Sequence, residues 1–294
     1  MSRTAVVTGI SGQQQGAVAR AFRNLGWQVR GIARGVGTDN AGETCVANLD
    51  TGEGLGDAFK GAAVVAFTLP QDHRDGAMSR MAHNVGLAAR AAGVRRLVLN
   101  LAGTIDETSD LPLFREMRAA RDAIQGCGVP SVVLSPTVYM DNLLAPWSLP
   151  GIVGDGVLAY PAPPDAPISW LSHKTLADFM VAAAERDEAA GQSIRVGGPA
   201  ALTGHDLARV LGERLARSVT YRRIPLVGFA AGLNDAFGPP AGDRIASLYA
   251  LLDEEPRAME VTADADRVLG VRPERFEDFI ARHDWTLTHG APAP

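Results

Sequence analysis

Thr4-Ala-Val-Val-Thr-Gly-Ile-Ser-Gly-Gln-Gln-Gln-Gly-Ala-Val-Ala-Arg-Ala-Phe22 is the segment on which the fold depends. Its apolar residues predict a short buried strand over Ala5 to Val7, followed by a glycine turn and a helix that opens near Gln14. Gly9 permits the tight turn, and Gly12 lets the backbone approach a phosphate group. Because the first N–H groups of a helix attract negative charge, the segment is typical of a dinucleotide pyrophosphate site. The alternative is an ordinary strand–helix turn.

The composition describes a chain that can bury a large core and has no basic surface for nucleic acid. Of the 294 residues, 46% are hydrophobic, and the formal net charge is −5. Phosphate backbones are bound by basic surfaces, so we expect no nucleic-acid partner. Cys45 and Cys127 have no metal-ligand spacing, which indicates a reducing compartment and no metal site. We find no signal-peptide pattern and no apolar run of ~18 residues, and therefore expect a cytoplasmic protein without a membrane partner.

Strand and helix patterns alternate over the first 135 residues. This order predicts an α/β fold with a Rossmann-type, doubly wound parallel sheet. The continuous apolar run from Ala62 to Pro70 is typical of a strand that is buried on both faces. After the first strand, the expected strands cover residues 28–33, 44–50, 62–70, 96–102 and 131–135, and the expected helices cover residues 16–25, 54–59, 76–92 and 113–125.

The end of the second strand favours NADP over NAD. An NAD site places a carboxylate there for the ribose hydroxyls, whereas an NADP site supplies arginine for the 2′-phosphate. Here the strand ends in Ala33-Arg34, Arg30 lies inside it, and no acidic residue follows before Asp39. We therefore predict that NADPH is the cofactor and that Arg34 binds the 2′-phosphate. The alternative is that Arg34 is a solvated charge at a strand end.

After residue 140 the regular alternation stops, and residues 146–167 hold six prolines. We predict an NAD(P)-binding Rossmann domain over residues 1–140 and a smaller, mostly C-terminal substrate-capping part over residues 141–294. Within the second part, residues from about 168 to 200 return to the sheet. Thr203 and Asp206 predict the start of a helix, and residues 219–224 predict a short strand. The apolar segments within 226–253 form either a movable lid or a packed helical hairpin.

The sequence resembles the NmrA-like branch of the atypical short-chain dehydrogenase/reductases, with a likeness that fades beyond residue 200. The matching motifs are Thr8-Gly-Ile-Ser-Gly-Gln-Gln-Gln-Gly16, Val29-Arg-Gly-Ile-Ala-Arg34, Leu49-Asp50, Lys60-Gly61-Ala62, Ala91-Ala-Gly-Val-Arg95, Gly128-Val-Pro130 and Pro136-Thr-Val-Tyr-Met-Asp-Asn142. The resemblance implies that Gly9, Ser11, Gly12, Gln13, Gln14 and Arg34 hold the pyrophosphate and the 2′-phosphate, that Asp50 lies near adenine, and that Leu69 and Pro70 flank the nicotinamide-side ribose. One departure is Gln15, which occupies the position of the family's third glycine. Since that glycine serves close helix packing, we expect the first helix to sit slightly away from the sheet.

The catalytic groups of the wider superfamily are missing. Its reductases use a tyrosine as proton donor, a lysine four residues later, and a serine near the end of the fifth strand. The chain has two lysines, Lys60 and Lys174, and neither follows a tyrosine by four residues. In register with the family, Asn100 and Leu101 stand at the serine positions. Some other group must therefore protonate the developing alkoxide, a role typically worth 10²–10⁴-fold.

We favour Tyr139 as this proton donor, because the segment after the sixth strand normally lies along the nicotinamide. The alternative is that Tyr139 forms an aromatic wall. Asn100 either contacts the substrate or supports its loop. Thr104, a water molecule and a phenol of the substrate itself are further candidates. His173 begins a helix and could act as an acid, although capping or surface histidines are the commoner case.

Two main functions agree with these features. The first is an NADPH-dependent ketoreductase for a bulky small molecule, similar to the reductases without a catalytic triad that tailor aromatic polyketide antibiotics. The second is an NADP-binding redox sensor of the NmrA type, which acts on a protein partner. A third hypothesis is a non-redox isomerase or cyclase that uses the fold as a scaffold. We favour the reductase, because the cofactor motifs are well preserved and residues 141–255 have the composition of a substrate cover.

Overall fold

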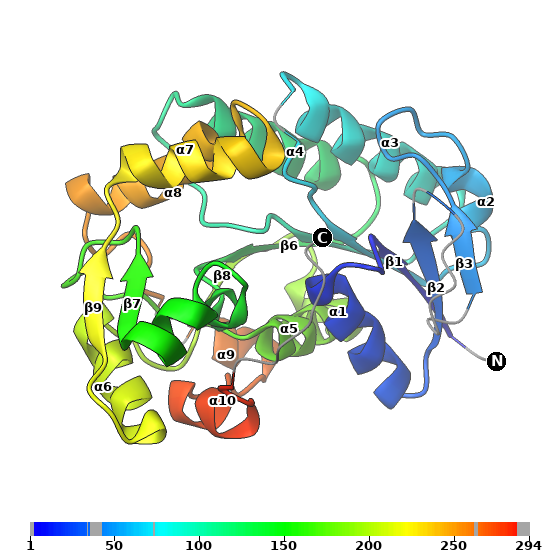
Figure 1. The fold of residues 1–294 in the computed structure, drawn as a ribbon. Helices are drawn as coiled ribbons and strands as arrows, with labels where there is room; N and C mark the ends of the chain where they lie inside the picture. The colour runs from blue at the N-terminus through cyan, green and yellow to red at the C-terminus, as the bar shows by residue number, and fades with distance from the viewer. Residues whose placement is uncertain (1–2, 34, 36–42, 73, 262–263, 287–294) are drawn as a thin grey trace. The chain divides into compact units, whose positions relative to one another are not determined.

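The computed structural model describes residues 3–33, 35, 43–72, 74–261 and 264–286 (Figure 1). The chain forms two compact units. The first comprises residues 1–137, 173–196 and 262–272, and the second comprises residues 138–172, 197–261 and 273–294. Each unit is therefore assembled from three separate segments of the chain.

A seven-stranded sheet in the order β3-β2-β1-β4-β5-β6-β8 forms the centre of the first unit (Figure 1). All of its neighbouring strands pair in parallel. The strand order reverses between β1 and β4, and ligands of open α/β sheets bind at such a reversal, outside the carboxyl ends of the strands. The strands are β1 (Thr4–Thr8), β2 (Gln28–Ala33), β3 (Glu43–Val46), β4 (Val64–Thr68), β5 (Arg96–Asn100), β6 (Ser131–Pro136) and β8 (Ser193–Val196).

Helices cover this sheet through apolar faces that repeat with the helical period. On α1, the buried face includes Ala17, Val18 and Phe22. Helix α1 packs against α5, and α3 packs against α4. Gly86 lets α3 approach its neighbour closely, because a Cβ there would lie 2.7 Å from the Cβ of Cys127. The helices are α1 (Gln13–Asn24), α2 (Leu55–Phe59), α3 (Ala77–Ala91), α4 (Pro112–Gln125), α5 (His173–Glu185), η3 (Asp187–Ala189) and α9 (Asp264–Leu269).

The second unit combines a two-stranded parallel sheet with a set of helices around an aromatic core. The strands β7 (Val157–Tyr160) and β9 (Thr220–Arg223) pair in parallel. The core contains Trp170, Phe276 and Phe279, each no more than 2% exposed. The helical elements are η1 (Met140–Leu144), η2 (Gly151–Asp155), α6 (Gly204–Leu215), α7 (Leu226–Phe237), α8 (Ala241–Glu254) and α10 (Phe276–Arg282).

The fold class predicted from the sequence is confirmed: the protein has an α/β fold with a parallel, doubly wound sheet. The helix start predicted from Thr203 and Asp206 is also present: α6 begins there, and the two residues form a capping box by bonding each other reciprocally. Several elements differ from the expectations, among them β3, which ends at Val46 and not at residue 50. Strand β7 lies inside the proline-rich segment that we expected to be a loop, and α9 was not predicted. Strand β7 is short and is paired with β9, in which Thr220 lies opposite Val157, so no local pattern indicates it.

Candidate functional site

The turn after β1 has the geometry of an anion site. Gly9 has a φ of +64°, in the left-handed region that glycine adopts readily. Gly12 caps α1 in an extended conformation, and a Cβ on it would lie 3.3 Å from the Gly9 carbonyl oxygen. The N–H groups of the first helical turn have no acceptor within the helix, and they carry the positive end of its dipole. Because Gly9, Ser11, Gly12 and Gln13 are exposed, this turn fits a pyrophosphate.

Four neutral polar side chains, Gln14, Gln15, Thr68 and Asn100, converge next to this turn, and we call them the amide network. The Thr68 hydroxyl oxygen accepts hydrogen bonds from Gln15 Nε2 and from Asn100 Nδ2, the latter at 3.1 Å. Asn100 Nδ2 also donates to Gln14 Oε1 at 3.4 Å. Gln15, at the third-glycine position, is only 5% exposed. Its side chain thus lies between the first turn of α1 and the end of β4, in the space that a glycine would leave open.

Asn100 also shapes the loop that follows β5. Its Oδ1 accepts the backbone N–H of Ala102 at 2.9 Å, and Ala102 has a φ of +59°, which is unusual for a residue other than glycine. Both hydrogens of the Asn100 amide are already donated to Thr68 and Gln14. This geometry favours loop support over substrate contact, the two roles that the sequence left open for Asn100. Nearby, the Thr104 hydroxyl donates to the Pro136 carbonyl oxygen at 3.2 Å and so has its own acceptor.

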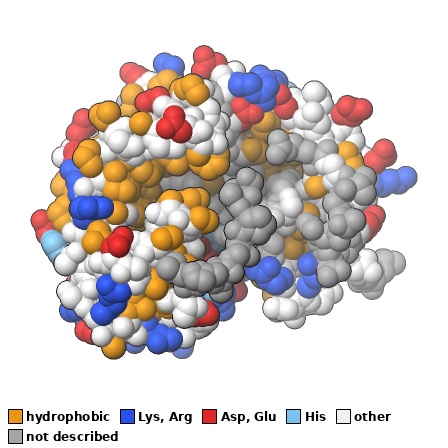
Figure 2. Space-filling view, viewed as in Figure 1, with side chains coloured by type: hydrophobic (Ala, Val, Ile, Leu, Met, Phe, Trp, Pro, Cys, Tyr) orange, Lys and Arg blue, Asp and Glu red, His pale blue; other side chains and the backbone are white. Residues whose placement is uncertain are grey.

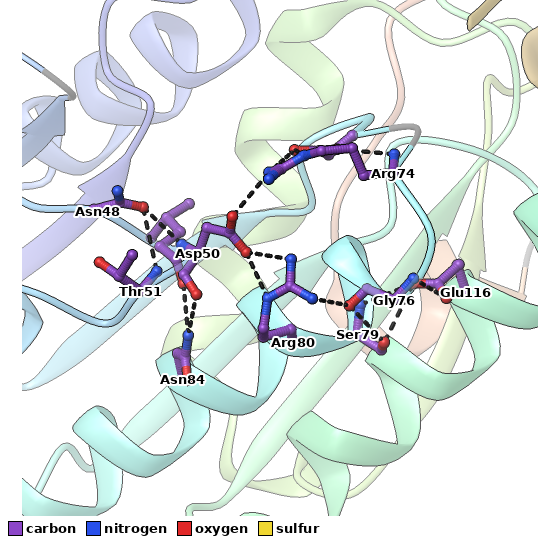
Figure 3. A network of polar contacts seen from close by, with 11 residues as sticks. Asn48, Asp50, Thr51, Arg74, Gly76, Ser79, Arg80, Asn84 and Glu116 are labelled. Atoms are coloured by element: carbon purple, nitrogen blue, oxygen red, sulfur yellow. Dashed lines mark hydrogen bonds and ion pairs between the residues drawn. The ribbon is translucent and has the colours of Figure 1, made fainter. Parts of the chain in front are cut away.

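A second, charged group surrounds Asp50, and we call Asp50, Asp72, Arg74 and Arg80 the arginine–aspartate network (Figure 3). The Asp50 carboxylate accepts hydrogen bonds from Arg80 Nε at 2.6 Å and from Arg74 Nη2 at 2.9 Å. Arg74 also pairs with Asp72 at 2.6 Å. Hydrogen bonds from Arg80 and then Arg74 hold the pKa of Asp50 below its usual value. The side chain predicted to lie near adenine is therefore ionised and fixed by two arginines.

Figure 3 also shows how main-chain contacts hold this region in place. Asn48 Oδ1 accepts the backbone N–H of Asp50 at 2.9 Å, and Asn84 Nδ2 donates to the Asp50 carbonyl oxygen at 2.8 Å. The Glu116 carboxylate accepts the backbone N–H groups of Gly76 and Ser79 at 3.0 and 3.2 Å. Glu116, from α4, thus caps the N-terminus of α3, whose own N-cap Gly76 has no side chain.

The second strand region contains two arginines, Arg30 and Arg34, and the structure describes the contacts of Arg30. Arg30 Nη1 donates to the carbonyl oxygens of Ala58 and Lys60, each at 2.9 Å, and Arg30 Nε pairs with Glu43. Arg30 therefore binds the carbonyl oxygens at the end of α2. Arg34 lies outside the described residues, so its predicted contact with a 2′-phosphate stays a prediction.

The remaining predicted cofactor residues follow β4. Leu69 is 1% exposed, and its backbone N–H donates to the Asn100 carbonyl oxygen at 2.9 Å. Pro70 is half-buried. Thr68, which directly precedes these two residues, was not among the site residues predicted from the sequence. The signal that could have revealed its part is the pair formed by Gln15 at the third-glycine position and a hydroxyl at the end of the neighbouring strand.

Tyr139, the predicted proton donor, belongs to the second unit. It is 6% exposed, precedes η1, and forms an isolated parallel bridge with Leu171. His173 begins α5, and Lys174 pairs with Asp178 at 2.8 Å on the surface of that helix. The acid role and the wall role of Tyr139 both stay predictions.

Three other hydroxyl or amide groups form a buried chain in the second unit. Asn142 Nδ2 donates to the Tyr160 hydroxyl at 3.0 Å, and the Tyr160 and Tyr249 hydroxyls lie 2.8 Å apart. Burial raises the pKa of Tyr160 well above its usual value and that of Tyr249 to about 12. The rings of Trp170 and Phe229 pack edge-on against this pair. Both tyrosines are therefore protonated at neutral pH.

Helix α7 carries apolar residues on exposed positions. Val227 and Phe237 are 84% and 64% exposed, and Ala230 is the buried residue of the helix. Hydrophobic side chains gather on the surface where α7 and α8 lie, at the left of Figure 2. The α7–α8 connection is tight, because Asn234 Oδ1 accepts the Gly242 backbone N–H at 2.7 Å. Among the described residues, no helix is long and apolar enough to span a membrane, and no group of His, Cys, Asp and Glu side chains could hold a metal ion.

Comparison with known sequences assigns the chain to a family. The sequence profile of the NmrA-like family matches residues 1–280. The chain belongs to the NmrA-like family. A curated relative in Streptomyces griseus, (4-alkanoyl-5-oxo-2,5-dihydrofuran-3-yl)methyl phosphate reductase, is 28% identical over 201 residues, which cover 68% of this chain and 70% of that protein.

Two solved structures place this NmrA-like chain among known folds. The triphenylmethane reductase of Citrobacter sp., solved with NADP(H), superposes with a TM-score of 0.77 at 20% identity, covering 95% of this chain and 99% of that protein. NmrA, a negative transcriptional regulator solved with NADP, gives a TM-score of 0.75 at 15% identity, covering 96% and 95% of the two chains. At these identities the likeness establishes the fold.

Proposed function

We propose that this NmrA-like protein is an NADPH-dependent ketoreductase that reduces a carbonyl of a bulky, aromatic polyketide-type molecule, as in the tailoring of angucyclinone antibiotics. The observation that carries the proposal is the exposed glycine turn Gly9–Gln13 at the reversal of strand order, which fits a dinucleotide pyrophosphate. The S. griseus relative is named as a reductase, and the Citrobacter reductase was solved with NADP(H). The first supports a role in reduction, and the second supports NADPH as the cofactor.

In this proposal, NADPH supplies a hydride to the carbonyl carbon, and a proton goes to the carbonyl oxygen, giving an alcohol and NADP⁺. The protein's part is to hold the dinucleotide at the glycine turn, with Ser11, Gly12, Gln13 and Gln14 at the phosphates, and to position the substrate. Arg34 would bind the 2′-phosphate, Asp50 would lie near adenine, and Leu69 and Pro70 would flank the second ribose. These assignments are proposals that follow from the family's motif.

The proton is assigned to Tyr139, because the chain has no tyrosine four residues before a lysine. Thr104 has its acceptor in the Pro136 carbonyl oxygen, and the Asn100 amide has donated both of its hydrogens. A phenol of the substrate that donates internally to its own ketone is the alternative donor.

A second candidate function is an NADP(H)-binding redox sensor that acts on a protein partner. The absence of a tyrosine–lysine pair favours it, and the regulator NmrA shares the fold. The exposed apolar residues of α7 would then contact a protein rather than cover a substrate.

The deciding experiment is to titrate the protein with NADPH and NADH, and then to follow NADPH oxidation with a panel of quinones and polycyclic aromatic ketones. Turnover of a polycyclic ketone, with a chiral alcohol as product, is the expected result. Tight NADPH binding without turnover across the panel would overturn the reductase and favour the sensor. A protein that binds neither nucleotide would overturn both.

A further inference from the structure

Two successive backbone N–H groups in the loop after β5 have no hydrogen-bond acceptor. They belong to Gly103 and Thr104, which are both buried, Thr104 to 3% exposure. Within the part of the chain that the structure describes, neither N–H group donates a hydrogen bond, whereas those of Ala102 and Ile105 on either side do. Unpaired N–H groups of buried residues are rare, because each costs free energy. This pair therefore indicates a place for an acceptor supplied by a ligand.

Ser135, on the neighbouring strand β6, fixes the direction of this part of the loop. Its hydroxyl donates to the Gly103 carbonyl oxygen at 3.1 Å and accepts the Ile105 N–H at 3.3 Å. The C=O and N–H groups of a trans peptide point in opposite directions. Because the Gly103 carbonyl points towards Ser135, the N–H of Thr104 points away from it. Ser135 thus holds one of the two donors in a fixed orientation without using it.

Asn100 holds the start of the same loop next to the dinucleotide turn. Its Oδ1 accepts the Ala102 N–H at 2.9 Å, and Ala102 is in the left-handed conformation. Successive N–H groups beside a left-handed residue are a common anion-binding arrangement. The Asn100 amide also contacts Gln14, in the first turn of α1, at 3.4 Å. Since the strand order reverses between β1 and β4, a dinucleotide bound at this turn extends towards β4 and β5, where this loop begins.

We propose that the backbone N–H groups of Gly103 and Thr104 form an oxyanion hole for the carbonyl that is reduced, an inference that rests on the proposed reduction. Asn100 and Ser135 are the positioning residues that hold its loop. When a hydride adds to the carbonyl carbon, the electron pair of the C=O π bond moves to the oxygen, which carries a negative charge until a proton reaches it. Fixed N–H donors stabilise this charge and transfer no proton themselves. The hole thus replaces part of the missing tyrosine–lysine pair, whichever group donates the proton.

The first test does not depend on turnover. The probe is 1-naphthol, whose absorption spectrum changes on ionisation and whose anion resembles the alkoxide. In the complex of the protein with NADP⁺, we expect the pKa of bound 1-naphthol to fall about one unit below its value in water, because the hole stabilises the anion. Ser135→Ala should remove this shift. If a water molecule satisfied both N–H groups instead, the pKa of 1-naphthol would not fall, and the hole would be overturned.

The matched control is Ser131→Ala, which removes a buried serine hydroxyl at the other end of the same strand. It should keep the pKa shift of 1-naphthol. In ketone reduction we expect Ser135→Ala to lower kcat about tenfold, with NADPH affinity within about twofold, because its donors are misplaced rather than removed. Ser135→Thr restores a hydroxyl and should recover most of this loss. Equal kcat values for Ser135→Ala and Ser131→Ala would contradict the hole.

A second variant removes one N–H group outright. Thr104→Pro has no backbone donor, whereas Thr104→Val loses only the side-chain hydroxyl, so kcat should be about 100-fold lower for the proline variant than for the valine variant. Equal rates would overturn the hole. If Thr104→Pro does not fold, Ser135→Ala carries the test. If the unchanged protein reduces no ketone, the proposed reductase fails, whereas a pKa shift of 1-naphthol that Ser135→Ala removes would still support the hole.

Discussion

The two polar networks at the carboxyl edge of the first unit's sheet are built on different physical principles. The arginine–aspartate network joins the loops after β3 and β4 through charged side chains, and Arg74 and Arg80 are 63% and 45% exposed. The amide network joins α1, β4 and β5 through neutral side chains, and Asn100 is fully buried. Exposed ion pairs are screened by salt and titrate with pH, whereas buried amides do neither.

This difference separates two tasks. The charged network fixes the loops after β3 and β4 through paired charges, next to Asp50, which is predicted to lie near adenine. The amide network fixes the positions of its side chains. Each N–H group donates in one direction, and a misplaced partner would leave a buried polar group without a hydrogen bond. It contains no group that titrates near neutral pH. A proton for the proposed reduction must therefore come from another part of the protein, from a water molecule or from the substrate.

The largest effect is expected at Arg34, which is proposed to bind the 2′-phosphate. Arg34→Glu should weaken NADPH binding about 100-fold and leave NADH binding almost unchanged, because a charge-assisted contact with the 2′-phosphate is replaced by repulsion. Titration of the variant with both nucleotides measures this. Equal losses for NADPH and NADH would show that Arg34 does not bind the 2′-phosphate.

The next effect tests the claim that the proton comes from outside both networks. Tyr139→Phe should lower kcat at least about tenfold with little change in NADPH affinity, because a general acid acts on the chemical step. Tyr221→Phe is the matched control, since the Tyr221 hydroxyl donates to the Ala162 carbonyl oxygen at 2.7 Å and should not affect the rate. An unchanged rate in Tyr139→Phe would leave Tyr139 as an aromatic wall.

A smaller effect is expected where a carboxylate of the charged region acts on a helix end. Glu116→Ala should destabilise the protein by about 1 kcal/mol and lower the melting temperature by a few degrees, because the first N–H groups of α3 lose their cap. Glu107→Ala removes an exposed partner of Arg121 and should change stability by less than about 0.5 kcal/mol. Similar melting temperatures for the two variants would contradict the capping role.

The smallest effect is the pH dependence of the arginine–aspartate network. The folded protein lowers the pKa of Asp50 below its usual value of 3.8, so the ionised carboxylate stabilises the fold. This contribution is present above the unfolded pKa and is lost as the pH falls through the lower, folded value. The difference in melting temperature between the unchanged protein and Asp50→Asn should therefore vanish in acid. It should also shrink in about 1 M salt. A difference that persists in acid would assign the effect to packing.

The sequence predicted the first unit closely, because its strands and helices carry local signals. Residues 28–33 were expected to form a strand and do so as β2, and the glycine turn lies where Gly9 and Gly12 indicated. The second unit was less predictable. Strand β7 is four residues long, lies in a proline-rich segment and pairs with the distant strand β9, so the local sequence does not indicate it. The sequence showed that Gln15 occupies the third-glycine position, but it did not show the hydrogen bond between Gln15 and Thr68.

The sequence by itself determined the fold class, the family and the place of the dinucleotide turn, since these depend on periodicity and on glycines close together in the chain. Only the tertiary structure decided which side chains act together. Gln15 and Thr68 are 53 residues apart, and Gln14 and Asn100 are 86 apart. They meet because a parallel sheet brings the carboxyl ends of its strands to one edge, in an order set by how the strands pair and not by their spacing along the chain.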